Sequence, residues 1–319
     1  MSHSAFKIGV DGGGTKTELI LVDATSTVVA RHLAPGCNPS QTGPDQAREI
    51  LRAGLQALLA AYPVSGLPPS VSALHLYMAG SPLFWREVAD SLTGYGPVVT
   101  GPDSLPVLEL ATAGAPGLVL HAGTGSFVAA RAPGGSVHYA GGLGWKLGDA
   151  GSGFDLGRRA IAYALLELQA RSATETRPLS PLTAALQAHT GLPDYATHSR
   201  FFYNDPAANA TISAFAPRVL ELAEHDCGPA QQVVADSVTD LARLADQVIH
   251  RLFPADPQPS RAGISYPPPL PCGVSGRILN SVPAGFALRS LVAKLRWPVT
   301  LTFITAAPSE GVRRLLGKL

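Results

Sequence analysis

The sequence predicts an α/β protein made of two halves that share one order of strands and helices. Each half opens with two short apolar segments joined by a glycine-rich turn, Asp11–Gly14 in the first half and Gly123–Gly125 in the second. Further strand-like segments then alternate with helix-like ones, which is typical of a sheet whose strands are joined by helices. The chain has 319 residues, about two average domains, so each half can bury a core of its own.

In the first half we expect the order βββαβαβα. Glycine tolerates the positive φ of a tight turn, so residues 11–14 are expected to join a strand at 6–10 to a return strand at 18–22. After them, strands are expected at 28–33, 74–78 and 97–100, and helices at 44–62, 83–92 and 104–112. The first of these helices lies between Pro44 and Pro63 and carries apolar residues every three or four positions.

The same order restarts near residues 115–117, which predicts an N-terminal domain at 1–115 and a C-terminal domain at 116–319. This second half also carries helical insertions. Strands are expected at 118–120, 127–130, 137–139 and 299–304, a weak strand before Gly273, and helices at 154–171, 233–252, 286–295 and the C-terminus. Residues 253–271 are rich in proline, which indicates a loop.

Composition and charge exclude several classes of function. The formal net charge is +1 and charged residues make up 15% of the chain, so we expect neither nucleic acid nor a membrane surface as a partner. No segment approaches the ~18–20 apolar residues that span a bilayer, and residues 1–7 lack an apolar signal core. Cys37, Cys227 and Cys272 lie far apart, which disfavours a zinc or disulfide framework and fits a cytoplasmic protein.

The first glycine turn has the composition of an anion-binding site. Successive glycines at 12–14 leave backbone N–H groups accessible. Thr15 adds a hydroxyl, Lys16 a positive charge, and Asp11 could hold Mg²⁺ through water. A strand follows rather than a helix, so this is no Walker P-loop. A plain hairpin turn is the alternative, but a second such turn at 123–125 favours phosphate binding, since two turns could grip a polyphosphate from both sides.

A third glycine-rich segment, Gly141–Gly153, contains six glycines around Asp149. So much glycine costs backbone entropy, and capping of the following helix by Asp149 or Ser152 would not require it. A binding loop is therefore the better interpretation.

Two further polar residues, Asp103 and Asn38, can each be interpreted in two ways. Asp103 follows a strand and precedes a helix, where an N-cap is the commoner role and a carboxylate base the functional alternative. Asn38 precedes Pro39, a common turn arrangement. The histidines, His121 and His138 among them, show no ligand spacing and are expected to be structural or surface residues.

Together, four segments resemble the N-acetylglucosamine kinase branch of the BadF/BadG/BcrA/BcrD ATPase family, within the sugar kinase, Hsp70 and actin superfamily. Residues 8–23 and 122–126 are similar to its two phosphate motifs, residues 141–159 to its glycine-rich signature, and residues 272–276 to its adenosine motif. The resemblance implies a duplicated ribonuclease-H-like (actin-like ATPase) fold, with ATP and Mg²⁺ held in a nucleotide cleft between two domains.

The resemblance also implies roles for individual residues. Asp103 would be the catalytic base, and Asp11 would hold the metal through water. The sugar contacts would be Asn38, Gly142, Gly144 and Asp149. The nucleotide would be bound by Gly12, Gly13, Gly14, Thr15, Lys16, Gly123, Thr124, Gly125 and Gly273.

The implied activity is an ATP-dependent kinase that transfers the γ-phosphate to the 6-hydroxyl of an amino sugar, with N-acetylglucosamine as the first choice. Leu143 stands where the family has Trp, and Ala150 where it has Glu. A glucosamine or N-acetylmuramic acid kinase, or a non-catalytic sugar and ATP sensor, therefore stays open as an alternative. A reductive activase is disfavoured, because it needs a cysteine-bound iron–sulfur cluster. The expected partner is a small-molecule sugar, and the resemblance suggests a homodimer.

Overall fold

The computed structural model describes residues 6–64, 67–172, 175–254 and 269–318, and most of the expected proline-rich loop at 253–271 lies outside them. The chain forms two compact units. Unit 1 holds the residues up to Gly114 together with those from Thr305 onward, and unit 2 holds Ala115–Ile304. Within the described ranges, no helix combines the length and the apolarity that crossing a bilayer requires.

The sheet of unit 1 has five strands, with the glycine hairpin at its centre. The strands are β1 (Phe6–Gly12), β2 (Lys16–Val22), β3 (Val28–Pro35), β4 (Val71–Met78) and β5 (Val98–Pro102), in the spatial order β3-β2-β1-β4-β5. The first three strands pair antiparallel, and β4 and β5 run parallel to β1. The carboxyl ends of β1, β4 and β5 therefore lie at one edge of the sheet, the edge where the turn after β1 begins.

Helices cover both faces of this sheet. Side chains alternate between the faces of a strand, so Leu19 and Leu21 of β2 pack against α2 (Pro44–Ala60) and α3 (Pro82–Asp90), while Ile20 and Val22 face the other way. On that second face lie α4 (Ser104–Thr112) and α11 (Pro308–Gly317). A short helix, α1 (Pro39–Thr42), precedes α2.

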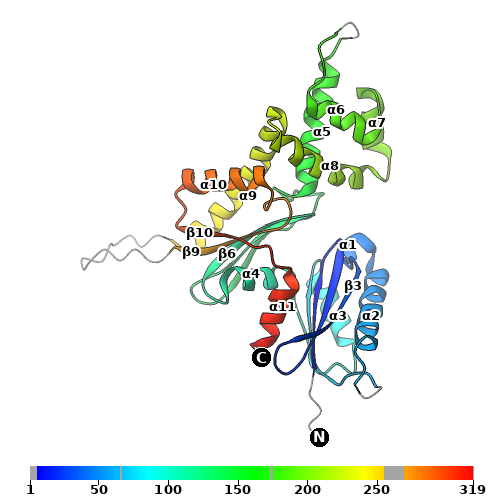
Figure 1. The fold of residues 1–319 in the computed structure, drawn as a ribbon, viewed down its shortest axis with the longest axis vertical. Coiled ribbons are helices and arrows are strands. Elements are labelled where there is room, and N and C mark those ends of the chain that lie inside the picture. Colours follow the sequence, from blue (N-terminus) through cyan, green and yellow to red (C-terminus); the bar gives the residue numbers. More distant parts are fainter. Residues whose placement is uncertain (1–5, 65–66, 173–174, 255–268, 319) are drawn as a thin grey trace, which may run out of the picture. The chain divides into compact units, whose positions relative to one another are not determined.

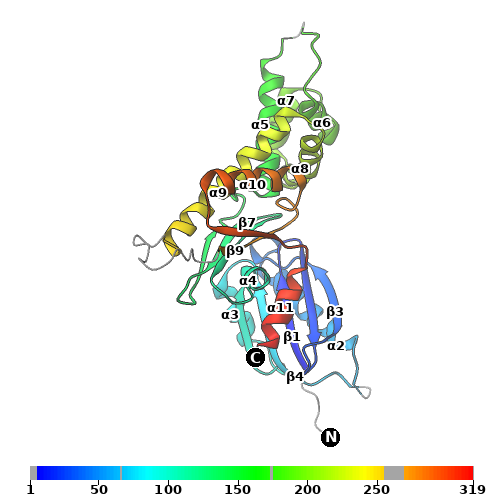
Figure 2. The same ribbon diagram turned by 60° about the vertical axis from the view of Figure 1, so that its left-hand side comes forward.

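The terminal helix α11 corrects the expected domain division. A C-terminal domain at 116–319 would include α11, but the helix lies on the strands of unit 1, where Figures 1 and 2 show it in red beside the blue strands. Its buried Val312 and Leu316 pack against the sheet, and a side chain at Gly9 would come within 2.2 Å of Val312. The Ser309 hydroxyl also donates to Glu18 at 2.9 Å. The apolar stripe of a helix shows that it is packed, but not against which sheet.

Replacing Leu316 by Ala is expected to cost unit 1 about 2–5 kcal/mol of stability, the usual loss for a fully buried leucine. Leu316 is 1% exposed, whereas Arg314 on the same helix is exposed and serves as the matched control. Native-state hydrogen exchange measures the effect, with the amides of β1 and β2 losing protection in L316A and keeping it in R314A. Unchanged protection of β1 and β2 in L316A would show that α11 does not stabilise this sheet.

The sheet of unit 2 repeats that of unit 1 strand for strand. Its strands are β6 (Gly117–Ala122), β7 (Ser126–Arg131), β8 (Val137–Gly141), β9 (Leu270–Ser275) and β10 (Val299–Phe303), in the order β10-β9-β6-β7-β8. Again the first three pair antiparallel and the last two run parallel to the first. The weak strand expected before Gly273 forms, because Pro271 stands near its start, where a missing N–H is tolerated. The predicted duplicated α/β fold is thereby confirmed.

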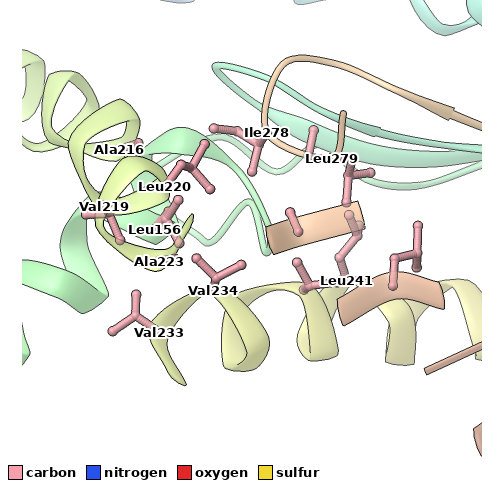
Figure 3. Close-up of a cluster of buried hydrophobic side chains, with 14 of the residues drawn as sticks. Leu156, Ala216, Val219, Leu220, Ala223, Val233, Val234, Leu241, Ile278 and Leu279 are labelled. Carbon is pink, nitrogen blue, oxygen red and sulfur yellow. The ribbon is translucent and has the colours of Figure 1, made fainter. Parts of the chain in front are cut away.

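One face of this second sheet is covered by α5 (Gly153–Ala170), α9 (Gly228–Leu252) and α10 (Val282–Leu295). Between α5 and α9 the chain inserts α6 (Pro181–Thr190), α7 (Tyr195–Asn204) and α8 (Ala208–Glu224), which pack along α5 (Figure 2). Figure 3 shows the core where these helices meet, with Leu156 of α5, Val219 of α8 and Val234 of α9 pointing toward one another. This core fixes the N-terminal end of α5, to which the glycine-rich loop leads.

Candidate functional site

The turn between β1 and β2 is fixed by bonds to its surroundings. Gly13 N–H donates to the Lys16 carbonyl at 2.9 Å, Ala79 N–H to the Gly12 carbonyl at 2.7 Å, and Cys37 N–H to the Gly13 carbonyl at 3.1 Å. The expected reason for its glycines was a positive φ, and this is wrong, since none of the three has one. Two of them have side chains close by: a Cβ on Gly12 would lie 2.4 Å from the end of the Met78 side chain, and one on Gly14 would lie 2.5 Å from that of Gln41.

Two acidic side chains of unit 1 share the environment of this turn. Asp11 is opposite Glu18 in the β1–β2 register. Burial raises the pKa of Asp11 to about 7, with further upward contributions from Asp103 and Glu18 and an opposing one from Lys16. Burial also raises the pKa of Asp103 to about 6, partly offset by the amides of Asp103 and Ser104. Burial disfavours the ionised form of both carboxyl groups, and for Asp11 the nearby negative charges add to this effect.

Asp103 stands between β5 and α4 and makes no side-chain capping hydrogen bond to α4. The structure thus does not use its carboxylate for the commoner role that the sequence suggested. It directly follows Pro102, the last residue of β5, and so lies on the same edge of the sheet as Asp11. The amides of Asp103 and Ser104 act on the carboxyl, but no cap to α4 ties it down, so it can still accept a proton from a substrate.

Asn38 does serve turn chemistry. Its Oδ1 accepts from the Ser40 N–H at 3.1 Å and caps α1. A Cβ on Gly80 would lie 2.8 Å from this oxygen, so the chain after β4 closes over the same residue. The turn interpretation is confirmed, and the role of Asn38 as a sugar contact stays a prediction.

In unit 2, the second glycine turn is joined to two other segments. Gly123 N–H donates to the Gly125 carbonyl at 2.9 Å, and Gly153, at the start of α5, donates to the Gly123 carbonyl at 2.8 Å. Ile278 N–H, after β9, donates to the Ala122 carbonyl at 3.1 Å. The turn, the start of α5 and the segment after β9 therefore form one assembly, in which backbone groups are held in fixed directions.

The loop after β8 places Asp149 at this assembly. Asp149 Oδ1 accepts from the Gly144 N–H at 2.9 Å, and a Cβ on Gly125 would lie 3.2 Å from Asp149 Oδ2. Gly142 and Gly144 have φ of 62° and 82°, which favour glycine. The cap of α5 is Ser152, whose hydroxyl accepts from the Asp155 N–H. Asp149, Gly142 and Gly144 are thus brought together with Gly123–Gly125, and burial raises the pKa of Asp149.

Gly273 lies inside β9, paired with Val119 on one side and Thr302 on the other. The glycine that the assembly requires is Gly276, with φ 89° and a Cβ position only 2.1 Å from the Ala122 carbonyl oxygen. In unit 1, Gly36 has the same importance, because its Cβ would lie 2.0 Å from the Gly14 carbonyl oxygen. The sequence alone does not distinguish these two glycines from the others. Only the long-range contacts show that a side chain at either position would collide with backbone.

Replacing Asp11 by Asn is expected to raise the unfolding temperature at pH 8 by about 2–4 °C, the shift that roughly 1 kcal/mol produces, and to change it less at pH 5. A carboxyl whose pKa is about 7 in the folded protein and about 3.9 when unfolded favours the folded state at low pH. That contribution is lost as the pH rises through 7, when the buried group ionises.

Thermal unfolding without nucleotide or Mg²⁺, followed by circular dichroism at both pH values, measures the effect. Asp90→Asn, at an exposed carboxylate of unit 1, is the matched control. An equal loss of stability at pH 5 and pH 8 in D11N would show that the pKa of Asp11 is not raised in the folded protein.

Comparison with known proteins agrees with these motifs. The model of the BadF/BadG/BcrA/BcrD ATPase family matches residues 8–259. The chain is 26% identical over 266 residues to the N-acetyl-D-glucosamine kinase of Dictyostelium discoideum, covering 79% of this chain and 81% of that protein.

Among solved structures, a candidate N-acetylglucosamine kinase from Chromobacterium violaceum is 26% identical, with a TM-score of 0.73 and coverage of 98% of this chain and 99% of that chain. A second from Porphyromonas gingivalis, 22% identical over 98% of this chain and 99% of that chain, has a TM-score of 0.71 and shows the same fold. A ROK family glucokinase from Streptomyces griseus, 15% identical and covering 97% of both chains, shares the fold at a TM-score of 0.56. The family match covers most of the chain, and on this ground the chain belongs to the BadF/BadG/BcrA/BcrD ATPase family.

Proposed function

We propose that the protein is a kinase that transfers the γ-phosphate of ATP to the 6-hydroxyl of an amino sugar, with N-acetylglucosamine as the preferred acceptor. The observation that carries the proposal is the Asp103 carboxyl, which makes no side-chain cap to α4 and whose charge contributes to the raised pKa of Asp11 at the start of the first glycine turn. The relatives described as N-acetylglucosamine kinases support the choice of acceptor.

Asp103 would act as the general base. A sugar hydroxyl is a weak nucleophile, and a carboxylate within hydrogen-bond reach can accept its proton as it attacks phosphorus. A pKa of about 6 suits this role near neutral pH, because the group is then ionised yet more basic than an ordinary aspartate. The proton passes from the hydroxyl to Asp103, and the γ-phosphate passes from ATP to the sugar oxygen.

The two glycine turns would bind the polyphosphate. In each unit the turn holds backbone groups in place through bonds to neighbouring segments, so little reorganisation is needed when a phosphate binds. Gly12, Gly13 and Gly14, with Thr15 and Lys16, would serve in unit 1, and Gly123, Thr124 and Gly125 in unit 2. Gly276, rather than Gly273, would shape the adjoining segment after β9.

Asp11 fits the chemistry of a magnesium site reached through water. Mg²⁺ prefers carboxylate and water oxygens. The pKa of Asp11 is raised mainly by burial and further by the charges of Asp103 and Glu18, and a nearby cation would offset both effects. When bound, the ion supplies neutralisation of the phosphate charge. Because the pKa of Asp11 is about 7 without a cation, a bound Mg²⁺ would favour the ionised carboxylate that holds it.

Each unit offers one polar side chain of the kind that binds sugar hydroxyls. With Oδ1 of Asn38 committed to Ser40, that side chain would offer its amide N–H₂ group as a donor. Asp149, with Oδ1 bound to Gly144, would offer Oδ2 as an acceptor for sugar hydroxyls. The loop glycines Gly142 and Gly144 would leave room for the ring.

The cysteines of the chain do not support the function of a reductive activase. Cys37, Cys227 and Cys272 are all buried, and burial raises the pKa of Cys272 to about 12. An iron–sulfur cluster is held by thiolates, and a thiol in an apolar interior resists ionisation.

A coupled assay of ADP release with Mg²⁺ and ATP tests the proposal. The acceptors are N-acetylglucosamine, glucosamine, N-acetylmuramic acid, glucose and a control without sugar. Release that requires N-acetylglucosamine is the expected result. ADP release that requires another sugar would identify that sugar as the acceptor. Release without any sugar would show an ATPase rather than a kinase. Sugar binding without ADP release would show a sensor.

A further inference from the structure

One side chain beside the second glycine turn has no part in the proposed function as argued so far. His121 is the residue of β6 that pairs with Phe127 on β7 and with Ser275 on β9. Its ring stacks on Phe127 with centroids 4.8 Å apart and planes 14° from parallel. Its Nδ1 is 2.8 Å from the Ser275 hydroxyl oxygen. The imidazole is therefore held in one orientation by both neighbouring strands.

This orientation directs the second ring nitrogen at the turn. A Cβ built on Gly123 would lie 3.3 Å from His121 Nε2, closer to it than to any other atom around that glycine. The absence of a side chain at Gly123 leaves this approach open. His121 thus presents a polar atom to the same turn whose backbone is fixed by Gly125 and Gly153.

The chemistry of the ring limits what it can offer. Burial lowers the pKa of His121 to about 4, so the imidazole is neutral at pH 7 and carries one N–H donor and one acceptor nitrogen. If the Ser275 hydroxyl donates to Nδ1, the proton of the ring lies on Nε2. The donor then points at the turn, where an anion would be bound.

We propose that His121 is an additional polyphosphate-binding residue, which donates a hydrogen bond from Nε2 to a phosphate oxygen held at Gly123–Gly125, while Ser275 fixes the tautomer that makes this donation available. The assignment rests on the proposed binding of ATP at this turn and adds a residue to it. Ser275 acts through His121 and is a positioning residue.

The test compares variants of the full chain by calorimetric titration with Mg²⁺·ADP and, separately, with adenosine, which has no phosphate. His121→Phe keeps an aromatic ring for Phe127 and removes the donor, His121→Gln keeps a neutral N–H donor, and Ser275→Ala removes the hydroxyl. The matched control is His138→Phe, since His138 forms a similar pair with Ser136 (Nε2 to Oγ, 3.1 Å) on the exposed part of β8.

We expect H121F and S275A to weaken ADP binding about 10-fold or more, the loss for a hydrogen bond to a charged group. H121Q should retain most of the affinity, and adenosine binding should change less than twofold throughout. H138F should bind both ligands like the wild type. Equal weakening of ADP and adenosine would show a structural role only and overturn the assignment.

These titrations distinguish a failure of the proposed function from a failure of the role of His121 alone. Wild-type protein that binds neither ADP nor adenosine would overturn the proposed function and, with it, the role of His121. ADP binding by the wild type that H121F and S275A leave within twofold would overturn the role of His121 alone. If H121F does not fold, the same ADP and adenosine comparison in S275A decides.

Discussion

Replacing Asp103 by Asn is expected to lower kcat for sugar phosphorylation by about 10²–10⁴-fold, the usual contribution of a general base. Asn matches the shape of Asp but cannot accept the proton of the sugar hydroxyl. Because Asp103 makes no side-chain cap to α4 and burial disfavours its ionised form, D103N should be at least as stable as the wild type at neutral pH. The affinity for ATP should also change little, since the base acts on the acceptor.

The pH profile separates this role from a structural one. The base works when ionised, so the wild-type rate should rise with pH through the pKa of about 6 and level off above it. In D103N the residual rate should lose this limb. Asp90→Asn, at the exposed end of α3, is the control and should keep both the rate and its pH dependence. Near-normal turnover by folded D103N would mean that another group takes the proton.

Replacing Asp155 by Ala is expected to cost about 3–5 kcal/mol of the free energy of unfolding of unit 2, the usual cost of breaking a buried ion pair. The Asp155 side chain is 8% exposed and pairs with Arg159 at 2.9 Å. It also accepts from the Ser237 hydroxyl of α9 at 2.7 Å. Its loss leaves Arg159 with one partner, Asp240, and removes the acceptor for the Gly151 N–H at the end of the glycine-rich loop.

The sign of the pH dependence follows from the same contacts. Burial raises the pKa of Asp155, but hydrogen bonds from Ser237 and Arg158 and the charge of Arg159 outweigh it, so the pKa is lowered overall. Its contribution to stability is thus present above the unfolded-state pKa of about 3.9 and is lost as the pH falls through the lower folded value.

Urea denaturation of D155A at pH 7 measures the loss. The control is Asp45→Ala, which breaks the exposed pair with Arg48 in α2 and should cost less than about 1 kcal/mol. A loss in D155A no greater than that in D45A would show that this network does not stabilise the start of α5.

Local patterns in the sequence were sufficient to predict most of the fold. The hairpins at 11–14 and 123–125 and the helix at 44–62 follow from turn chemistry and apolar spacing, which act over a few residues. The placement of α11 on the sheet of unit 1 could not be predicted, because Val312 and Leu316 would fit any apolar sheet face. Helices α6–α8 fall in a segment for which the sequence suggested only helical insertions.

In the candidate site, too, the features that depend on long-range contacts could not be predicted from local sequence patterns. Asp11 and Asp103 are far apart in the sequence, but the parallel order of β1, β4 and β5 brings the ends of those strands to one edge. The spacing of Asp11 and Asp103 in the sequence does not show that they share this edge. Their assignment to one site comes from the resemblance of the motifs. The sequence indicates a structural or surface role for His121, because no other candidate ligand lies at a suitable spacing. Its partners, Phe127 and Ser275, come from two other strands. Gly36 and Gly276 likewise stand out only through the backbone that approaches them.

Phosphorylation of the 6-hydroxyl of an amino sugar by this chain is tested most directly by identifying the product. Wild-type protein is incubated with Mg²⁺, ATP and N-acetylglucosamine, and the sugar is examined by ³¹P and proton NMR. The expected product is a phosphate ester at carbon 6, which D103N forms at a rate about 10²–10⁴-fold lower than the wild type. A phosphate at carbon 1, or ADP accompanied by inorganic phosphate and unmodified sugar, would contradict it.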